Sequence, residues 1–204
     1  MYKGKKTYFY NGEILWEGRG RAGRTLIYDD EERKSWEVII VLPGVEVIPE
    51  RTFRLCTNVK KVIMHEDVKR IEFDAFVQCF KLISVKLSRN LEYIGVCAFW
   101  SCSSLTSIFI PQSCREIDRW AFRYCRQLLI LGMPQNIQIR DYAFGNTLLM
   151  TKLPFSFAVD EDENFSPEDE AIAIQWVKTI NDENAFALHR ACSSFNPLLE
   201  IIHT

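Results

Sequence analysis

The 204-residue sequence lacks an excess of charge of either sign, since 25 Lys and Arg residues stand against 27 Asp and Glu residues. Proteins that bind nucleic acid or a membrane surface usually carry a strong basic excess, so we expect neither partner here. No stretch approaches the roughly 18 consecutive apolar residues that a membrane-spanning helix needs. Residues 1–8 are charged and lack the apolar stretch of a secretory signal. We therefore expect an intracellular, cytoplasmic protein.

Glycine, proline and metal-binding motifs are also scarce. Nine Gly and seven Pro, together with 13% aromatic residues, exclude a disordered or fibrous chain as the main state. The sequence contains no Cys-x-x-Cys pair, and its histidines (His65, His189 and His203) lie far apart in the chain, so we expect no metal and no other cofactor. Seven cysteines, an odd number without an export signal, favour reduced, buried thiols over disulfides.

What the sequence does contain is a repeat of 23 residues, which Phe53, Phe76, Phe99 and Phe122 mark. Six further columns, in which every residue is aliphatic, Met or Cys, keep the same spacing over four repeats. A unit of this length cannot bury its apolar side alone, whereas stacked units bury one another, so the pattern predicts a solenoid. The six columns are Ile48, Ile71, Ile94 and Ile117; Cys56, Cys79, Cys102 and Cys125; Val59, Leu82, Leu105 and Leu128; Val62, Val85, Ile108 and Leu131; Met64, Leu87, Ile110 and Met133; and Val68, Leu91, Cys114 and Ile137.

Each repeat contains a predicted β-strand, and one repeat illustrates it. Ile108 and Ile110 alternate with Ser107 and Phe109, so the first pair points into the stack and the second pair points away from it. Pro111 ends the strand, because proline has no N–H to donate to the next ladder bond. An Ala-Phe step precedes each strand and is expected on the opposite wall of the coil, where the small residue lets neighbouring coils approach.

The pattern Ile-x-x-x-Ala-Phe-x-x-Cys-x-x-Leu-x-x-Ile-x-Ile-Pro resembles the BspA-like class of leucine-rich repeats over residues 36–150. Thr52 departs from the pattern by replacing the Ala, and His65 and Ser88 stand where other repeats have the strand-ending proline. The family's usual glycine after the Ile is kept only at Gly95. The resemblance implies an α/β solenoid, a curved stack with a parallel β-sheet on its concave face.

The two ends of the chain differ from the repeats. The Asn11-Gly12 step favours a type I′ turn in a β-hairpin that covers the open end of the stack. Residues 160–170 hold seven acids and form a solvated linker or, alternatively, an acidic docking segment. Ser166-Pro167 suits the start of a helix, and Leu188-His189-Arg190-Ala191 is similar to part of the ankyrin signature. We expect four segments: an N-terminal cap with the hairpin (1–35), the repeat solenoid (36–150), the acidic linker (151–166) and C-terminal α-helices of ankyrin-like type (167–204).

Residues 18–23 match the Gly-x-Gly-x-x-Gly fingerprint of dinucleotide-binding proteins, which requires a helix directly after it. Residues 24–30 have no helical period, so a loop between two cap strands is our interpretation and nucleotide binding through Gly18–Gly23 is an alternative. Arg19, Arg21 and Arg24 also suit nonspecific contact with RNA phosphates, but acidic residues flank them. The sequence has no Gly-x-Ser-x-Gly motif, no phosphate loop and no base fixed beside a cysteine. We therefore expect no enzymatic activity.

The outward positions of the predicted strands are the candidate functional residues. In a repeat stack the inward residues hold the core, whereas the outward residues vary freely and present a long surface to a partner. Phe109 is expected at the centre of the contact, with Lys86 favouring an acidic group nearby. The sequence thus predicts a non-catalytic protein–protein interaction scaffold, and the alternative is a structural or assembly module of a longer protein. The candidate partner-binding residues are Lys61, Ile63, Ser84, Lys86, Ser107, Phe109, Ile130 and Gly132.

Overall fold

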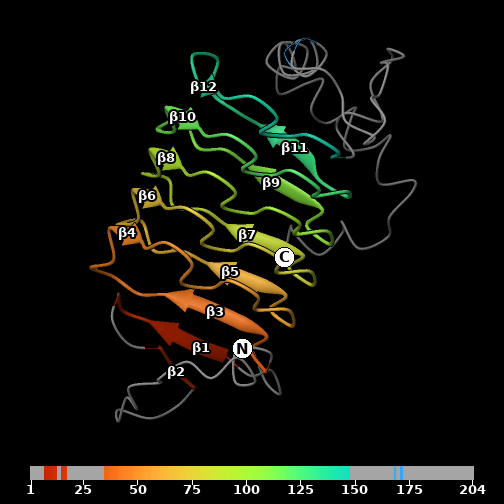
Figure 1. Ribbon diagram of the computed structural model, residues 1–204. Coiled ribbons are helices and arrows are strands. Elements are labelled where there is room, and N and C mark those ends of the chain that lie inside the picture. The colour runs from red at the N-terminus through yellow and green to blue at the C-terminus, as the bar shows by residue number, and fades with distance from the viewer. Residues whose placement is uncertain (1–6, 13–14, 18–34, 148–167, 169–170, 172–204) are drawn as a thin grey trace.

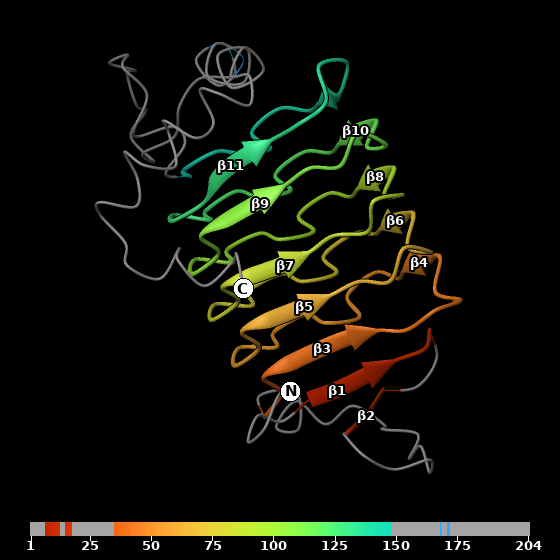
Figure 2. The same cartoon turned by 180° about the vertical axis from the view of Figure 1, so that it is seen from behind.

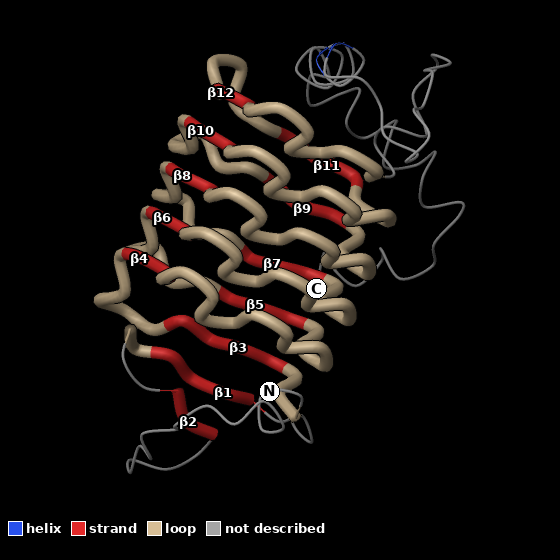
Figure 3. The backbone as a smooth tube through the Cα atoms, in the orientation of Figure 1, coloured by secondary structure: helices blue, strands red, loops and turns tan. Residues whose placement is uncertain are grey.

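The computed structural model describes residues 7–12, 15–17 and 35–147, together with Glu168 and Ala171. Within these residues the chain winds through a regular stack of coils, each adding one short strand to each of two sheets (Figure 1). The same stack seen from behind has the strands in the same order (Figure 2). Turns and loops make up the rest of each coil (Figure 3). The 23-residue period of the sequence is therefore one turn of a solenoid.

The larger sheet has seven strands in the order β11-β9-β7-β5-β3-β1-β2. Every pair in it is parallel except β1 with β2, as expected for strands that follow one another after a full coil. Its strands are β1 (Thr7–Tyr10), β2 (Leu15–Glu17), β3 (Val38–Val41), β5 (Lys61–Ile63), β7 (Ser84–Lys86), β9 (Ser107–Phe109) and β11 (Leu129–Gly132).

A second parallel sheet, which we did not predict, has five strands in the order β12-β10-β8-β6-β4. Each strand is only two residues long and ends on an isoleucine. In β4, β6, β8 and β10 this isoleucine belongs to the repeat column and is buried, whereas Ile139 of β12 comes one residue early and is half-buried. The strands are β4 (Val47–Ile48), β6 (Arg70–Ile71), β8 (Tyr93–Ile94), β10 (Glu116–Ile117) and β12 (Gln138–Ile139).

The third wall of each coil is a turn that contains the Ala-Phe step. In the first coil the N–H groups of Arg51, Phe53 and Leu55 donate to carbonyl oxygens of the next coil at 2.8–2.9 Å. Only every second N–H donates to the next coil, and two residues per coil adopt the left-handed backbone conformation with positive φ. This conformation costs a residue other than glycine about 1–2 kcal/mol. The hydrogen bonds between coils offset that strain. The left-handed residues are Arg51, Leu55, Asp74, Gln78, Cys97, Ser101, Trp120, Tyr124, Tyr142 and Asn146.

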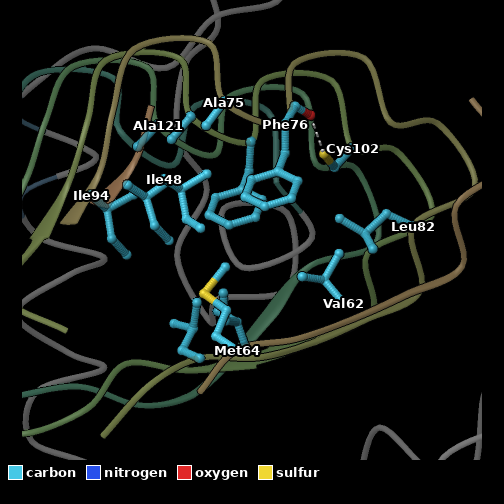
Figure 4. Close-up of a cluster of buried hydrophobic side chains, with 14 of the residues drawn as sticks. Ile48, Val62, Met64, Ala75, Phe76, Leu82, Ile94, Cys102 and Ala121 are labelled. Atoms are coloured by element: carbon cyan, nitrogen blue, oxygen red, sulfur yellow. Dashed lines mark hydrogen bonds between the residues drawn. The ribbon is translucent and has the colours of Figure 1, made fainter. Parts of the chain in front are cut away.

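The phenylalanine column forms a single file through the centre of the stack, as the repeat predicts. The ring of Phe76 lies 5.0 Å from the rings of both Phe53 and Phe99, and Phe122 continues the file at 5.2 Å from Phe99. A fifth ring, Phe144, follows at 5.3 Å although it comes 22 rather than 23 residues later. Ile48, Ala75, Leu82 and other column residues surround the rings (Figure 4) and are completely buried. The core prediction is confirmed for these columns, except that Val85 is only half-buried and that Ile130, not Leu131, pairs with Ile108.

The cysteine column has a hydrogen-bonding role that hydrophobicity alone does not explain. The thiols of Cys79, Cys102 and Cys125 donate to the carbonyl oxygens of Phe53, Phe76 and Phe99, respectively, at 3.1–3.2 Å. Figure 4 shows the bond from Cys102 to Phe76. Each thiol therefore satisfies a buried carbonyl of the preceding coil. All six cysteines within the described residues are free.

The departures from the repeat pattern keep the same local geometry by other means. In place of the strand-ending proline, Ser88 accepts a hydrogen bond from the N–H of Asn90 at 3.0 Å, and His65 accepts one from Asp67 through Nδ1 at 3.3 Å. Both side chains thereby stabilise the turn that the proline ring fixes in later coils. Thr52, which replaces the Ala, donates its hydroxyl to the Pro49 carbonyl at 2.9 Å.

The N-terminal hairpin extends the larger sheet and covers the first coil. Tyr10 on β1 packs edge-on against Phe53 at 5.2 Å and so closes the file of rings. The predicted two-residue type I′ turn is wrong, because Tyr10 pairs with Leu15 and four residues, 11–14, connect the strands. Gly12 still adopts a positive φ of 100°.

The α/β class and the C-terminal α-helices require correction. The described residues 7–12, 15–17 and 35–147 form twelve strands and no helix, so this part of the chain is an all-β leucine-rich repeat solenoid with two parallel sheets. The turn wall explains the error: hydrogen bonds to the next coil occupy N–H groups that a helix would use within its own segment. The acidic linker and the ankyrin-like segment, apart from Glu168 and Ala171, lie outside the described residues, as does most of the cap.

Candidate interaction site

The candidate residues fall into two rows on the outer face of the larger sheet. Strand register aligns Lys61, Ser84 and Ser107 in an inner row that also contains Val38 and Leu129. Two residues further along each strand, or three in β11 because of its register shift, is a second row, which we call the outer row; its members are Ile40, Ile63, Lys86, Phe109 and Gly132.

Exposure distinguishes the two rows. Ser107, at the centre of the inner row, is only 7% exposed, and Lys61 and Ser84 are half-buried. In the outer row Lys86 is exposed and Phe109 is 58% exposed, the largest value among the large hydrophobic residues that the structure describes. The outer row is therefore the accessible part of the candidate site.

Phe109 and Gly132 form one structural unit. A Cβ atom on Gly132 would lie 2.9 Å from Cε2 of Phe109, which is closer than two such carbons approach. The ring of Phe109 thus lies over the backbone of Gly132 and leaves its other side to solvent. Because Gly132 has no side chain, the exposed ring can pack directly on its backbone, which serves as a platform for the ring.

Ile130 does not take the place that the 23-residue spacing predicts. It pairs with Ile108, an inward residue, and Leu129 instead stands beside Ser107, because the register of β11 shifts by one residue before Gly132. An extra residue in one strand of a pair is a β-bulge, and such bulges occur at the edges of sheets. Ile130 therefore lies in the register of the core column.

The outer face of the smaller sheet is satisfied by its own residues. The guanidinium of Arg70 lies 4.1 Å from the centre of the Tyr93 ring, and the Tyr93 hydroxyl donates to Asp118 at 2.8 Å. Burial and then this hydrogen bond raise the pKa of Tyr93. Arg140 and Glu116 pair at 2.8 Å in the last coil. This face has the character of a structural surface.

The structure reveals an aromatic hollow that our sequence reasoning missed. Trp100 and Tyr124 meet edge to face at 5.8 Å, and Phe80, 41% exposed, lies on the same open hollow of about 340 Å³. Ser101, Ser103 and Arg126 complete its lining. These residues lie next to or between the Phe and Cys columns, at positions where the repeat imposes no residue type. The only available signal in the sequence was therefore three aromatic residues at such positions in successive repeats.

The sequence also raised the questions of nucleotide binding, metal binding and cysteine catalysis. The Gly18–Gly23 fingerprint lies outside the described residues. Within the described ones no three potential metal ligands come together, and no helix there is long and apolar enough to cross a membrane. Burial raises the pKa of both Cys97 and Cys114 to about 11, so little reactive thiolate exists there near neutral pH. These two thiols are therefore poorly suited to nucleophilic catalysis.

Solved structures with similar folds are bacterial leucine-rich repeat proteins. One from T. pallidum superposes with a TM-score of 0.50 and 27% identity, covering 52% of this chain and 53% of that protein. A leucine-rich cell surface protein from Faecalibacterium prausnitzii has a TM-score of 0.42 and 16% identity, covering 70% and 45%. The pneumococcal vaccine antigen PcpA has a TM-score of 0.40 and 15% identity, covering 68% and 37%. The chain thus spans about half the length of the T. pallidum protein.

No curated protein matches the sequence. The model of the BspA type leucine-rich repeat region matches residues 33–161 in six copies, which is more than half of the chain. The matched segment contains the described coils, with their stacked phenylalanines and hydrogen-bonded cysteines. The chain belongs to the BspA-type leucine-rich repeat family.

Proposed function

We propose that the chain is a non-catalytic protein-interaction scaffold that binds a partner through the outer row of the larger sheet. The observation that carries this proposal is the exposure of Phe109, 58% on a platform of glycine, in a sheet whose inward residues are buried. Phenylalanine is enriched in the centres of protein interfaces, where one buried aromatic ring contributes a large share of the affinity.

The row supplies both an apolar anchor and a charge. Ile63 is half-buried on one side of Lys86, and Phe109 follows on the other side in the register of the sheet. A strand or loop of the partner laid across the row would cover the ring and bring an acidic group to Lys86. Burying the exposed half of a phenylalanine side chain contributes about 1–2 kcal/mol, which corresponds to a change in affinity of roughly 5- to 30-fold.

The test uses the full chain as bait in three forms: native, Phe109→Glu and Val47→Glu. Val47 is 40% exposed on the smaller sheet and provides the matched control for placing a carboxylate at an exposed apolar position. Proteins captured by the native chain and by Val47→Glu but lost with Phe109→Glu are purified, and their Kd is measured. We expect at least about a tenfold weakening with Phe109→Glu and nearly unchanged melting temperatures. If no partner distinguishes the two variants, the proposal fails.

The alternative is a structural or assembly module for a longer protein. It is favoured by the limited coverage of the T. pallidum protein, of which this chain spans 53%. A module of this kind needs no ligand on the outer row, so Phe109→Glu would leave every interaction of the chain intact. The same three baits therefore separate the two functions.

A further inference from the structure

Charge is strongly segregated between the two halves of each coil. The ten carboxylates of residues 38–147 all lie in segments that contain the smaller sheet and its flanking turns. The other halves, which contain β5, β7, β9 and β11 of the larger sheet, carry cations but no carboxylate; of these cations Lys60 pairs with Glu37, which precedes β3, at 3.3 Å. These segments are 52–64, 75–87, 98–110 and 121–133, and their seven cations are Arg54, Lys60, Lys61, Lys81, Lys86, Arg123 and Arg126.

The aromatic hollow lies on this cationic side of the stack, along a surface that we call the turn ridge, made of residues 54–58, 77–81, 100–104 and 123–127. Arg126 is exposed and lines the hollow. It forms no ion pair with the described residues. Lys81, also exposed, uses one of its donors on the side chain of Asn58 at 2.6 Å, so its charge is not neutralised.

The hollow is held in shape by its own side chains. Arg123 lies 4.9 Å from the centre of the Tyr124 ring and donates to the Tyr124 hydroxyl at 3.2 Å. The same ring meets the edge of Trp100 at 5.8 Å. Since the rings are already fixed by these contacts, a ligand that enters the hollow loses little free energy to ordering them.

We propose that the turn ridge is a second docking site, which binds an acidic peptide segment through one apolar anchor residue. The anchor enters the hollow between Phe80, Trp100 and Tyr124, and carboxylates beside it in the peptide pair with Arg126 and Lys81. Charge complementarity selects this partner, because the ridge offers only cations to a ligand. This site is separate from the outer row and does not depend on the function proposed there.

A single-stranded nucleic acid is the other polyanion that combines charge with flat apolar groups. Successive bases stack on aromatic faces aligned along one strand. The rings of Trp100 and Tyr124 are inclined at 84° to each other, which does not give two parallel platforms. The chain as a whole carries a net charge of −2 and so lacks the long-range attraction of nucleic-acid-binding proteins.

The experiment selects peptides from a phage-displayed random library on the immobilised full chain. Enriched peptides are synthesised, and their Kd values are measured by fluorescence anisotropy on the native chain and on Arg126→Glu and Arg115→Glu. Arg115 is exposed on the acidic side of the coil, so Arg115→Glu makes the same change of charge at a position away from the hollow. Phe109→Glu serves as the control for the outer row, and melting temperatures verify that each variant is folded.

We expect enriched peptides that place Asp or Glu around one aromatic or aliphatic residue. Arg126→Glu should weaken them at least tenfold, whereas Arg115→Glu and Phe109→Glu change the Kd by less than about threefold. The proposal is overturned if no peptide is enriched, if acidic residues are not in excess, or if Arg126→Glu binds as well as Arg115→Glu. Tighter binding of a uridine oligonucleotide than of the peptides, lost with Arg126→Glu, would also overturn it.

Discussion

Removing one ring from the file of phenylalanines tests the physical basis of the fold. Phe99 is completely buried between Phe76 at 5.0 Å and Phe122 at 5.2 Å, with both pairs of rings nearly parallel. Replacing a buried phenylalanine by alanine lowers the free energy of unfolding by about 3–5 kcal/mol, since apolar contacts are lost and a cavity remains. The stacked coils leave little room for neighbouring side chains to move into that cavity. We expect a loss near the upper end, about 4–5 kcal/mol.

Phe99→Leu isolates the contribution of the aromatic contacts. Leucine keeps most of the apolar volume but loses both ring pairs, each of which contributes about 0.5–1.5 kcal/mol beyond the area it buries. The expected loss is therefore about 1–3 kcal/mol. Urea denaturation followed by circular dichroism measures both variants, and Phe99→Leu stays measurable even if Phe99→Ala unfolds. A loss below about 1.5 kcal/mol for Phe99→Ala would refute the claim that the file is the core of the stack.

Two further predictions follow from buried or hydrogen-bonded titratable groups. Cys102 is fully buried, and burial raises the pKa of its thiol. Iodoacetamide at pH 7.5 should therefore label Cys102 at least a hundredfold more slowly in the folded chain than in urea. Equal labelling rates, measured by mass spectrometry, would contradict this burial. Because the pKa of Tyr93 is raised in the folded state, its stabilising contribution is present below a pH of about 10 and is lost as the pH rises further. Urea titrations between pH 8 and 11 should therefore show a smaller loss of stability with Tyr93→Phe than with the native chain.

The core was predictable because its residues recur at a fixed spacing along the sequence. A residue type that recurs every 23 positions, such as the phenylalanine at 76 and 99, occupies the same place in every coil, and only burial requires a large apolar residue there each time. The larger sheet followed from alternation, since Ile108 and Ile110 point inward and Phe109 outward. Hydrophobic patterning is sufficient for features that depend on burial.

The smaller sheet and the turn wall were not predictable on the same grounds. Two-residue strands such as Tyr93–Ile94 are too short to show alternation. The left-handed residues carry ordinary side chains, for example Leu55 and Trp120, where glycine would have marked the conformation. Hydrogen bonds to the next coil determine this backbone, and bonds between residues more than 20 positions apart leave no local signal.

The candidate site was predicted in part. The outward position of Phe109 followed from alternation, whereas the burial of Ser107 and the register of Ile130 did not, because they depend on a bulge in β11 and on packing outside the repeat pattern. The aromatic hollow combines positions from three successive coils, Phe80, Trp100 and Tyr124, that share no column of the repeat. Surface sites assembled in this way become visible only when the coils are stacked in space.

Stacking also constrains where charge is placed on a solenoid. Equivalent residues of adjacent coils lie about 5 Å apart, so like charges in one column repel, whereas alternating signs attract. The smaller sheet has this alternation: the column that begins with Glu46 continues with Lys69, Glu92 and Arg115, and the first pair lies 3.2 Å apart. On the cationic side Glu37 pairs with Lys60 at 3.3 Å, whereas the coils that carry Lys81 and Arg126 have no acid in their larger-sheet halves. The positive charge of these coils therefore remains available to a partner, which is why both proposed sites lie on that side.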